Sequence, residues 1–160
     1  MRRVSLVAVV AAAALALALA GCATGSPAQS AQSAGSAQPE PVEQISAGVV
    51  KFNLDGAGDA LEARVTVNGG ETYATASKLE SGEAEIVLHG PEGDSSDYAY
   101  DGYGVGTMGV PAGTYGITVK PADASGTIYV LSYPTGQLDV EHAETEDLFA
   151  QVEEFAANAG

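Results

Sequence analysis

Short runs in which apolar and polar residues alternate fill most of the chain between residues 45 and 134, and glycine-rich turns separate them. In the first run, Val50, Phe52 and Leu54 share one side of an extended backbone. Period-two alternation bounded by turn residues is typical of half-buried strands. About seven short strands at nearly regular spacing predict a mainly β fold, a single antiparallel β-sandwich of jelly-roll-like form. After the first run, strands are expected at 61–67, 72–79, 83–89, 97–103, 114–120 and 127–133.

The last part of the chain has a helical pattern instead. Leu148, Phe149, Val152 and Phe155 fall on one apolar stripe at helical spacing, which predicts an amphipathic helix over about 145–157. The stripe requires a covering surface. Either the helix docks on the sandwich, or these four side chains bind a structural or assembly partner.

The N-terminus has the three-part layout of an export signal. Arg2 and Arg3 form a positive region, residues 4–20 are apolar except for one serine, and the run ends in Leu19-Ala20-Gly21-Cys22. This ending resembles the lipobox of bacterial lipoproteins, in which an aliphatic residue, a small residue, and Gly or Ala precede the cysteine. Cys22 is the only cysteine of the chain, so no disulfide can form within it.

The lipobox resemblance implies a processing route and a location. Cleavage would follow Gly21, and Cys22 would carry the lipid, with palmitate among its acyl chains. Two acyl chains are enough for stable anchoring. The expected location is extracytoplasmic, lipid-anchored to the bacterial cell membrane, and the outer membrane if the cell has two, because Ala23 replaces the aspartate that signals inner-membrane retention.

Composition divides the rest of the chain. The segment after the signal is rich in Ser, Gln, Gly and Pro and has almost no large apolar residue, which predicts a flexible tether. The expected organisation is therefore a signal peptide at 1–21, lipidated cysteine and tether at 22–44, β-sandwich at 45–134, and an acidic segment with the helix at 135–160.

Charge excludes one class of partner. The formal net charge is −15, and removal of residues 1–21 leaves four basic against 21 acidic residues, a charge of −17. Nucleic-acid backbones are bound by Lys and Arg, so no nucleic-acid partner is expected. The expected partners are the membrane, through the lipid, and an envelope protein or glycan that is cationic or neutral.

Two turns within the sandwich carry a second resemblance. A Pro-Glu-Gly turn at 91–93 follows one strand, and the run PAGTY at 111–115 opens a later one. These motifs resemble those of small β-sandwich modules attached to bacterial secreted proteins, of the pre-peptidase C-terminal type, over roughly residues 47–134. The resemblance implies a non-catalytic role in secretion, adhesion or contact with polymers.

Groups for catalysis are few. His89 and His142 are the only histidines of the folded part, and the sequence has no zinc spacing, phosphate loop or Gly-x-Ser-x-Gly motif. We therefore expect no enzyme and no required cofactor. Abundant carboxylates leave a secreted hydrolase with two acids as a lower alternative.

The run from Glu92 to Gly102 contains the candidate binding residues. Asp94, Asp97 and Asp101 offer the hard oxygen ligands that calcium prefers, although their spacing matches no EF-hand loop. The alternative is a solvated acidic loop.

Three tyrosines alternate in the same run. Tyr98, Tyr100 and Tyr103 have apolar rings with polar hydroxyls, which suit contact with sugars or peptides. The alternative is packing, because tyrosine is also a good strand residue. Together these features favour a membrane-anchored, non-catalytic binding or envelope-interaction module.

Overall fold

Six strands and one helix form in residues 40–160, the part of the chain that the computed structural model describes. The predictions for the signal peptide, for Cys22 and for most of the tether lie outside the described residues. The first strand begins at Val42, within the segment expected to be tether. The elements are β1 (Val42–Ser46), β2 (Val49–Asn53), β3 (Leu61–Val67), β4 (Glu71–Gly90), β5 (Gly93–Met108), β6 (Gly113–Pro134) and α1 (Thr145–Ala159).

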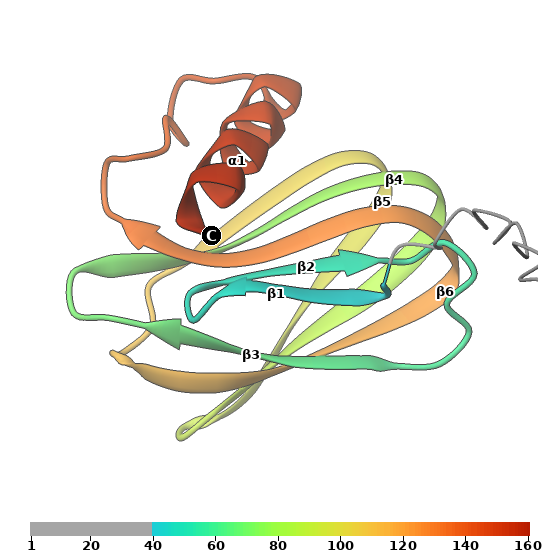
Figure 1. The fold of residues 1–160 in the computed structure, drawn as a ribbon, viewed down its shortest axis with the longest axis horizontal. Helices are drawn as coiled ribbons and strands as arrows, with labels where there is room; N and C mark the ends of the chain where they lie inside the picture. The colour runs from blue at the N-terminus through green and yellow to red at the C-terminus, as the bar shows by residue number, and fades with distance from the viewer. Residues whose placement is uncertain (1–39) are drawn as a thin grey trace, which may run out of the picture. The chain divides into compact units, whose positions relative to one another are not determined.

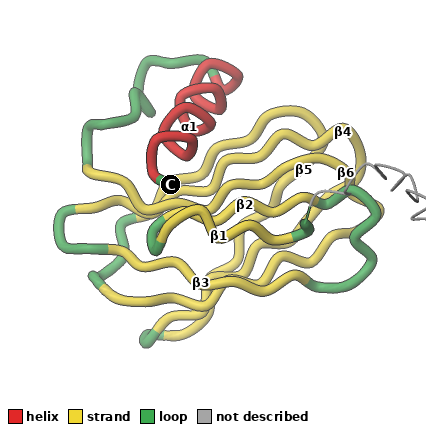
Figure 2. Tube along the Cα trace, in the orientation of Figure 1, coloured by secondary structure: helices red, strands yellow, loops and turns green. Residues whose placement is uncertain are grey.

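The three long strands β4, β5 and β6 bend and pass through both layers of the fold (Figure 1). Residues 113–119 of β6 pair with β3, whereas residues 127–131 pair with β2, and β4 runs antiparallel beside both parts of β6. The prediction of a mainly β antiparallel sandwich with a C-terminal helix is confirmed. Two pairs of predicted strands are continuous through the bend, as the tube in Figure 2 also shows, which reduces the seven predicted strands to five. The sixth strand is β1, which was not predicted.

Two glycines lie where β4 and β6 bend together. Gly82 of β4 and Gly126 of β6 both have positive φ, at 76° and 126°. A Cβ atom at Gly82 would collide with the backbone of Asp123, and one at Gly126 would collide with the backbone of Lys78. Only glycine therefore allows the two strands to approach so closely at the bend.

The interior of the sandwich follows the alternation of the sequence. Val50, Phe52 and Leu54 are all buried in one core between the layers, as their spacing predicts. Their neighbour Val49 points to the opposite face of the same layer and belongs to a second core. That layer is therefore apolar on both faces, and its outer face has to be covered.

Helix α1 covers this outer face (Figure 1). Leu148, Phe149 and Val152 are buried in the second core, and Phe155 is half-buried at its border. The ring of Phe149 meets Tyr129 of β6 edge-on, with centroids 5.8 Å apart. The helix thus docks on its own sheet, and its apolar stripe is not a free surface for a partner.

Candidate functional site

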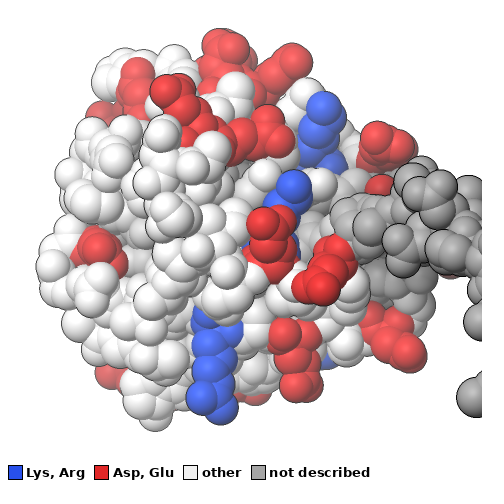
Figure 3. Space-filling view, viewed as in Figure 1, with Lys and Arg blue, Asp and Glu red and all other residues white. Residues whose placement is uncertain are grey.

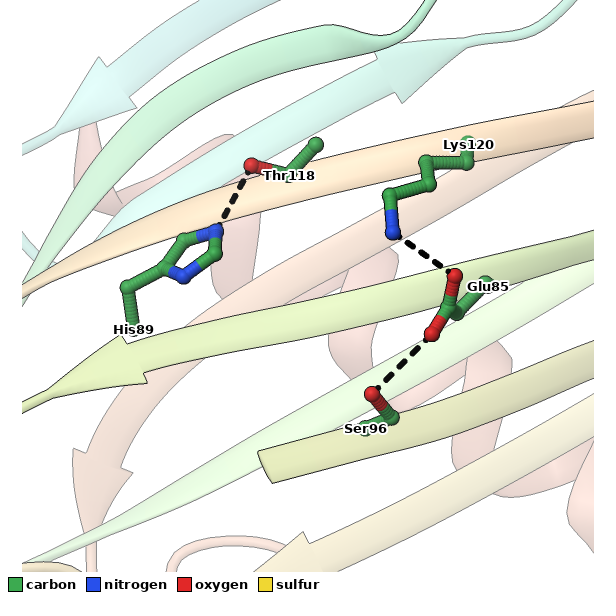
Figure 4. A network of polar contacts seen from close by, with 5 residues as sticks. All are labelled: Glu85, His89, Ser96, Thr118 and Lys120. Carbon is green, nitrogen blue, oxygen red and sulfur yellow. Dashed lines mark hydrogen bonds and ion pairs between the residues drawn. The ribbon is translucent and has the colours of Figure 1, made fainter. Parts of the chain in front are cut away.

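The second layer turns its outer face to solvent. It consists of β3 and the paired parts of β4, β5 and β6 that contain residues 83–90, 93–101 and 113–120. The outward side chains of this face are mainly hydroxyl, charged and aromatic groups. Figure 4 shows five of them, His89, Thr118, Lys120, Glu85 and Ser96, joined in part by hydrogen bonds.

His89 lies at the turn between β4 and β5. Its Nδ1 is 2.9 Å from Oδ1 of Asp94 across the hairpin, and its Nε2 is 2.8 Å from Oγ1 of Thr118 on β6. The imidazole is therefore held between two strands. Its two polar partners are thus a carboxylate and a hydroxyl group on the solvent-facing side of the layer.

Glu85 forms the second part of the network. Lys120 on β6 donates a hydrogen bond of 2.9 Å to one carboxylate oxygen, and Ser96 on β5 donates one of 3.1 Å to the other. These bonds, that of Lys120 first, lower the pKa of Glu85 below its ordinary value. The carboxylate therefore stays ionised and neutralises Lys120.

Tyr98 and Tyr100 stand beside this network on β5. Their side chains are 54% and 58% exposed, and the two rings are nearly parallel, with centroids 6.5 Å apart and planes inclined by 23°. The strand register places Glu85 opposite Tyr98 and Glu83 opposite Tyr100. We call these four residues the Tyr–Glu patch. It combines two exposed aromatic surfaces with two carboxylates on adjacent strands.

Tyr103 does not belong to this patch. The register passes from Asp101 to Tyr103 and omits Gly102, whose φ is +90°. Beyond this bulge β5 enters the helix-covered layer, where the Tyr103 ring meets Phe149 edge-on at a centroid distance of 5.6 Å. Of the three tyrosines predicted to contact ligand, the structure therefore brings two together and places the third against the helix.

The side chain of Tyr103 is engaged on both sides. Its hydroxyl donates a hydrogen bond of 3.4 Å to Glu146, and the ammonium of Lys78 lies 5.4 Å from its ring centroid. The contact with Tyr103 raises the pKa of Lys78 above its ordinary value. Tyr103 remains 37% exposed, but its contacts are those of a residue that holds α1.

The three aspartates predicted to bind calcium do not converge. Asp94 points outward to His89, whereas Oδ2 of Asp97 accepts a hydrogen bond of 2.9 Å from Thr75 in the opposite layer. Asp101 follows at the bend, beside the bulge at Gly102. Between residues 40 and 160, no group of three or more His, Cys, Asp or Glu side chains is placed to hold a metal ion.

The bond between Asp97 and Thr75 joins the two layers of the sandwich near β5. Gly106 lies directly beside it, and a Cβ there would be 2.5 Å from Oδ2 of Asp97 and 2.9 Å from Oγ1 of Thr75. Gly104 makes similar room for the hydroxyl of Ser77, which lies within 3.4 Å of the Gly104 carbonyl. The contact between Asp97 and Thr75 therefore links the two layers, whereas Ser77 and Gly104 are paired within one layer.

A hollow of about 240 Å³ opens at the end of the sandwich near the β4–β5 turn. Leu88, Met108 and Tyr115 contribute apolar surface to it, and Glu92 and Asp94 contribute carboxylates. The Tyr115 hydroxyl donates a hydrogen bond of 2.6 Å to the carbonyl of Pro111, within the PAGTY run. The hydroxyl is thus used to fix the loop before β6.

Acidic side chains dominate the surface. Figure 3 shows more acidic than basic surface on the face that it draws. The part of the chain at 40–160 contains all 21 acidic residues but only four basic ones, Lys51, Arg64, Lys78 and Lys120. None of its helices is both long and apolar enough to cross a bilayer.

Known proteins resemble the chain only in part. No family model and no curated protein sequence matches it. A cupin domain from Bordetella pertussis Tohama I is 15% identical, with a TM-score of 0.32 over 53% of this chain and 79% of that one. The Drosophila melanogaster CENP-C cupin domain is 10% identical, with a TM-score of 0.32 over 53% and 58%. A ruminal GH26 endo-beta-1,4-mannanase is 19% identical, with a TM-score of 0.30 over 63% and 25%.

With TM-scores of 0.30 to 0.32, these similarities carry no conclusion about this chain. This chain spans little more than half of the second of these structures and a quarter of the third. The site therefore has to be interpreted from its own residues.

Sequence reasoning missed the carboxylates of the Tyr–Glu patch and the contacts of His89. A usable signal was present, because the Pro-Glu-Gly turn at 91–93 fixes the hairpin register. Counting outward from that turn pairs His89 with Asp94, Glu85 with Tyr98 and Glu83 with Tyr100 without a break.

Proposed function

We propose that the chain is an extracytoplasmic lipoprotein whose β-sandwich is a non-catalytic binding module, and that the Tyr–Glu patch contacts its ligand. The lipobox-like signal ending in Cys22 supports the location. The paired exposure of Tyr98 and Tyr100 is the observation that carries the binding role.

The exposure of this pair contrasts with four of the other five tyrosines of the sandwich. Tyr73, Tyr115, Tyr129 and Tyr133 are all buried in one of the two cores. A single exposed aromatic residue needs no explanation, but a contiguous exposed pair is typical of interaction sites. Aromatic rings with a polar tip are also enriched at interfaces.

The proposal assigns no role to catalysis, calcium or helix binding. Asp94 and Thr118 hold His89 between two strands, and the aspartates of β5 point to different faces. The apolar stripe of α1 is covered by the sheet. These assignments leave the Tyr–Glu patch available for a ligand.

Replacing Cys22 with Ala tests the anchor. We expect the wild-type protein to take up an alkyne-tagged palmitate and to sediment with membranes, because two acyl chains hold a protein stably on a bilayer. The Cys22→Ala variant should lose the label, and its membrane-bound fraction should fall. Equal labelling and equal sedimentation of the two proteins would refute the lipoprotein assignment.

Replacing both exposed tyrosines tests the binding role. We expect the full chain, purified in detergent, to be retained on envelope material of the source cell, and Tyr98→Ala/Tyr100→Ala to reduce the retained fraction about tenfold, since such contacts dominate interfaces. The melting temperature should hardly change, because exposed substitutions have small effects. Tyr98→Phe/Tyr100→Phe is the matched control and should keep most of the retention. Equal retention by the alanine variant would contradict the proposed site.

A further inference from the structure

We infer that the ligand of the Tyr–Glu patch is an extended peptide segment rich in Lys or Arg, which adds as a strand to the free edge of β5. This inference rests on the proposed function and names its ligand class. Four properties of the described residues support it: a free strand edge, two exposed ring faces, an unpaired carboxylate and the charge of the domain.

The edge of β5 offers main-chain groups for hydrogen bonding, apart from the amide of Tyr98, which donates a hydrogen bond of 2.9 Å to Oδ1 of Asp97. Within residues 40–160, β5 pairs with β4 alone and ends the order β1-β2-β6-β4-β5. On the other side of the sandwich, the amide of Thr66 on β3 donates a hydrogen bond of 2.7 Å to the carbonyl of Ala47, which ties β3 to the β1–β2 turn. An extended peptide can bind to a strand edge by continuing its hydrogen bonding.

The rings of Tyr98 and Tyr100 would lie beside the outward side chains of such a strand. Residues two apart on a strand share a face, and directly opposed residues on neighbouring strands have Cβ atoms about 5 Å apart. Basic side chains two residues apart in the peptide would therefore reach one ring each. An ammonium or guanidinium group over a tyrosine ring is stabilised by the ring quadrupole.

The protein already uses this contact within its own fold. Lys51 lies 5.7 Å from the ring centroid of Tyr129, and Lys78 lies 5.4 Å from that of Tyr103. No basic side chain of residues 40–160 lies over Tyr98 or Tyr100 in this way. Tyr98 and Tyr100 thus offer the same kind of ring face to a cation from a binding partner.

The carboxylates of β4 complete the recognition of a cation. Glu85 is neutralised by Lys120, its neighbour on β6. Glu83, opposite Tyr100, is exposed and has no ion pair or side-chain hydrogen bond within the described part of the chain. A basic side chain over Tyr100 would find this negative charge on the next strand, so ring and carboxylate act on one cation.

The net charge of the domain favours the same partner. Residues 40–160 carry 21 acidic and four basic residues, and three of the four bases, Lys51, Lys78 and Lys120, are engaged within the fold. Such a field attracts cations and repels anions, which accelerates the encounter with a basic peptide at low salt. A neutral glycan could stack on the same rings, but it would use neither the strand edge nor Glu83.

The test uses defined peptides and the full chain in detergent. The probe is an acetylated and amidated octapeptide of alternating Thr and Lys, which places all lysines on one face of a strand. We expect it to bind in titration calorimetry, whereas octapeptides with Gln or Glu at the lysine positions should bind at least about tenfold more weakly.

Variants of the patch separate its contributions. Tyr98→Ala/Tyr100→Ala should weaken binding of the lysine peptide about tenfold, and Glu83→Gln about threefold, at the size of partly exposed cation–π and ion-pair contacts. Tyr98→Phe/Tyr100→Phe should bind as the wild type does, because the ring faces remain. Melting curves establish that each variant is folded.

A modified peptide tests the strand addition itself. A lysine peptide with N-methyl groups on its backbone should bind the wild-type protein at least about tenfold more weakly, because it cannot add as a strand.

Other outcomes have distinct meanings. The inference would be overturned if the glutamine peptide or the N-methylated peptide bound as tightly as the unmodified lysine peptide. Binding of a neutral oligosaccharide such as chitohexaose, lost in the alanine variant while the lysine peptide fails to bind, would also overturn it but leave the proposed function intact. Unchanged envelope retention by the alanine variant would refute the proposed function itself.

Discussion

Replacing Val152 with Asp is expected to lower the free energy of unfolding by about 3–5 kcal/mol, the cost of an unpaired buried charge. Val152 is fully buried in the second core, at the centre of the helix–sheet contact. For a domain of this size, the melting temperature should fall by roughly 10–20 °C. Thermal denaturation followed by circular dichroism measures this change.

Ala157→Asp is the matched control. Ala157 lies on the exposed side of α1, so this variant adds the same charge to the same helix without burying it. Its melting temperature should stay within about 2–3 °C of the wild type, as for most surface substitutions. If Val152→Asp also melted like the wild type, α1 would not be docked on the sheet.

Replacing Gly126 with Ala is expected to have a second large effect. A Cβ at this position would overlap the backbone of Lys78 and lie 2.8 Å from Cα of Leu79, and the φ of 126° is strained for any residue with a side chain. Backbone strain costs about 1–3 kcal/mol and overpacking a similar amount. The neighbours are main-chain atoms, so they cannot move aside as a flexible side chain would.

Gly69→Ala serves as the comparison for Gly126→Ala. No heavy atom lies within 4 Å of the position that its Cβ would occupy, so this variant should unfold at nearly the wild-type denaturant concentration. Urea titration of both variants gives the difference directly. Equal midpoints would show that a Cβ atom fits at the bend of β4 and β6, contrary to the close approach in the structure.

The alternation of the sequence predicted the faces of the strands well. Val50, Phe52 and Leu54 entered the interior as expected, and Leu148, Phe149 and Val152 formed the buried side of the helix. In both cases the pattern reflects a local rule, because one face of a strand or helix has to be removed from water.

The continuity of the long strands was not predictable in this way. At Glu80–Gly82 and again at Ala122–Gly126 the alternation breaks, and glycine and polar residues suggest turns. The register shows irregularities within β4 and β6 there, so the pairing continues past the break. A bulge and a turn have the same local composition, and only the partner strand distinguishes them.

The candidate site was predicted in part for the same reason. Tyr98 and Tyr100 are two residues apart and share a face, as any strand requires. Tyr103 lies beyond the bulge at Gly102, where the strand changes layer, so its spacing in the sequence was misleading. The carboxylates of Glu83 and Glu85 join the tyrosines through pairing between strands, which no single run of residues reveals.

The central position of β6 has a consequence for the order of events in folding. β6 pairs with β2, β3 and β4, and it is the last strand of the chain, ending at Pro134. Neither layer can therefore be completed before the residues of β6 are available, and pairings between distant segments form slowly. Before β6 is available, β2 and β3 lack their partner in the sheet, which would favour the unfolded state that the proposed export needs.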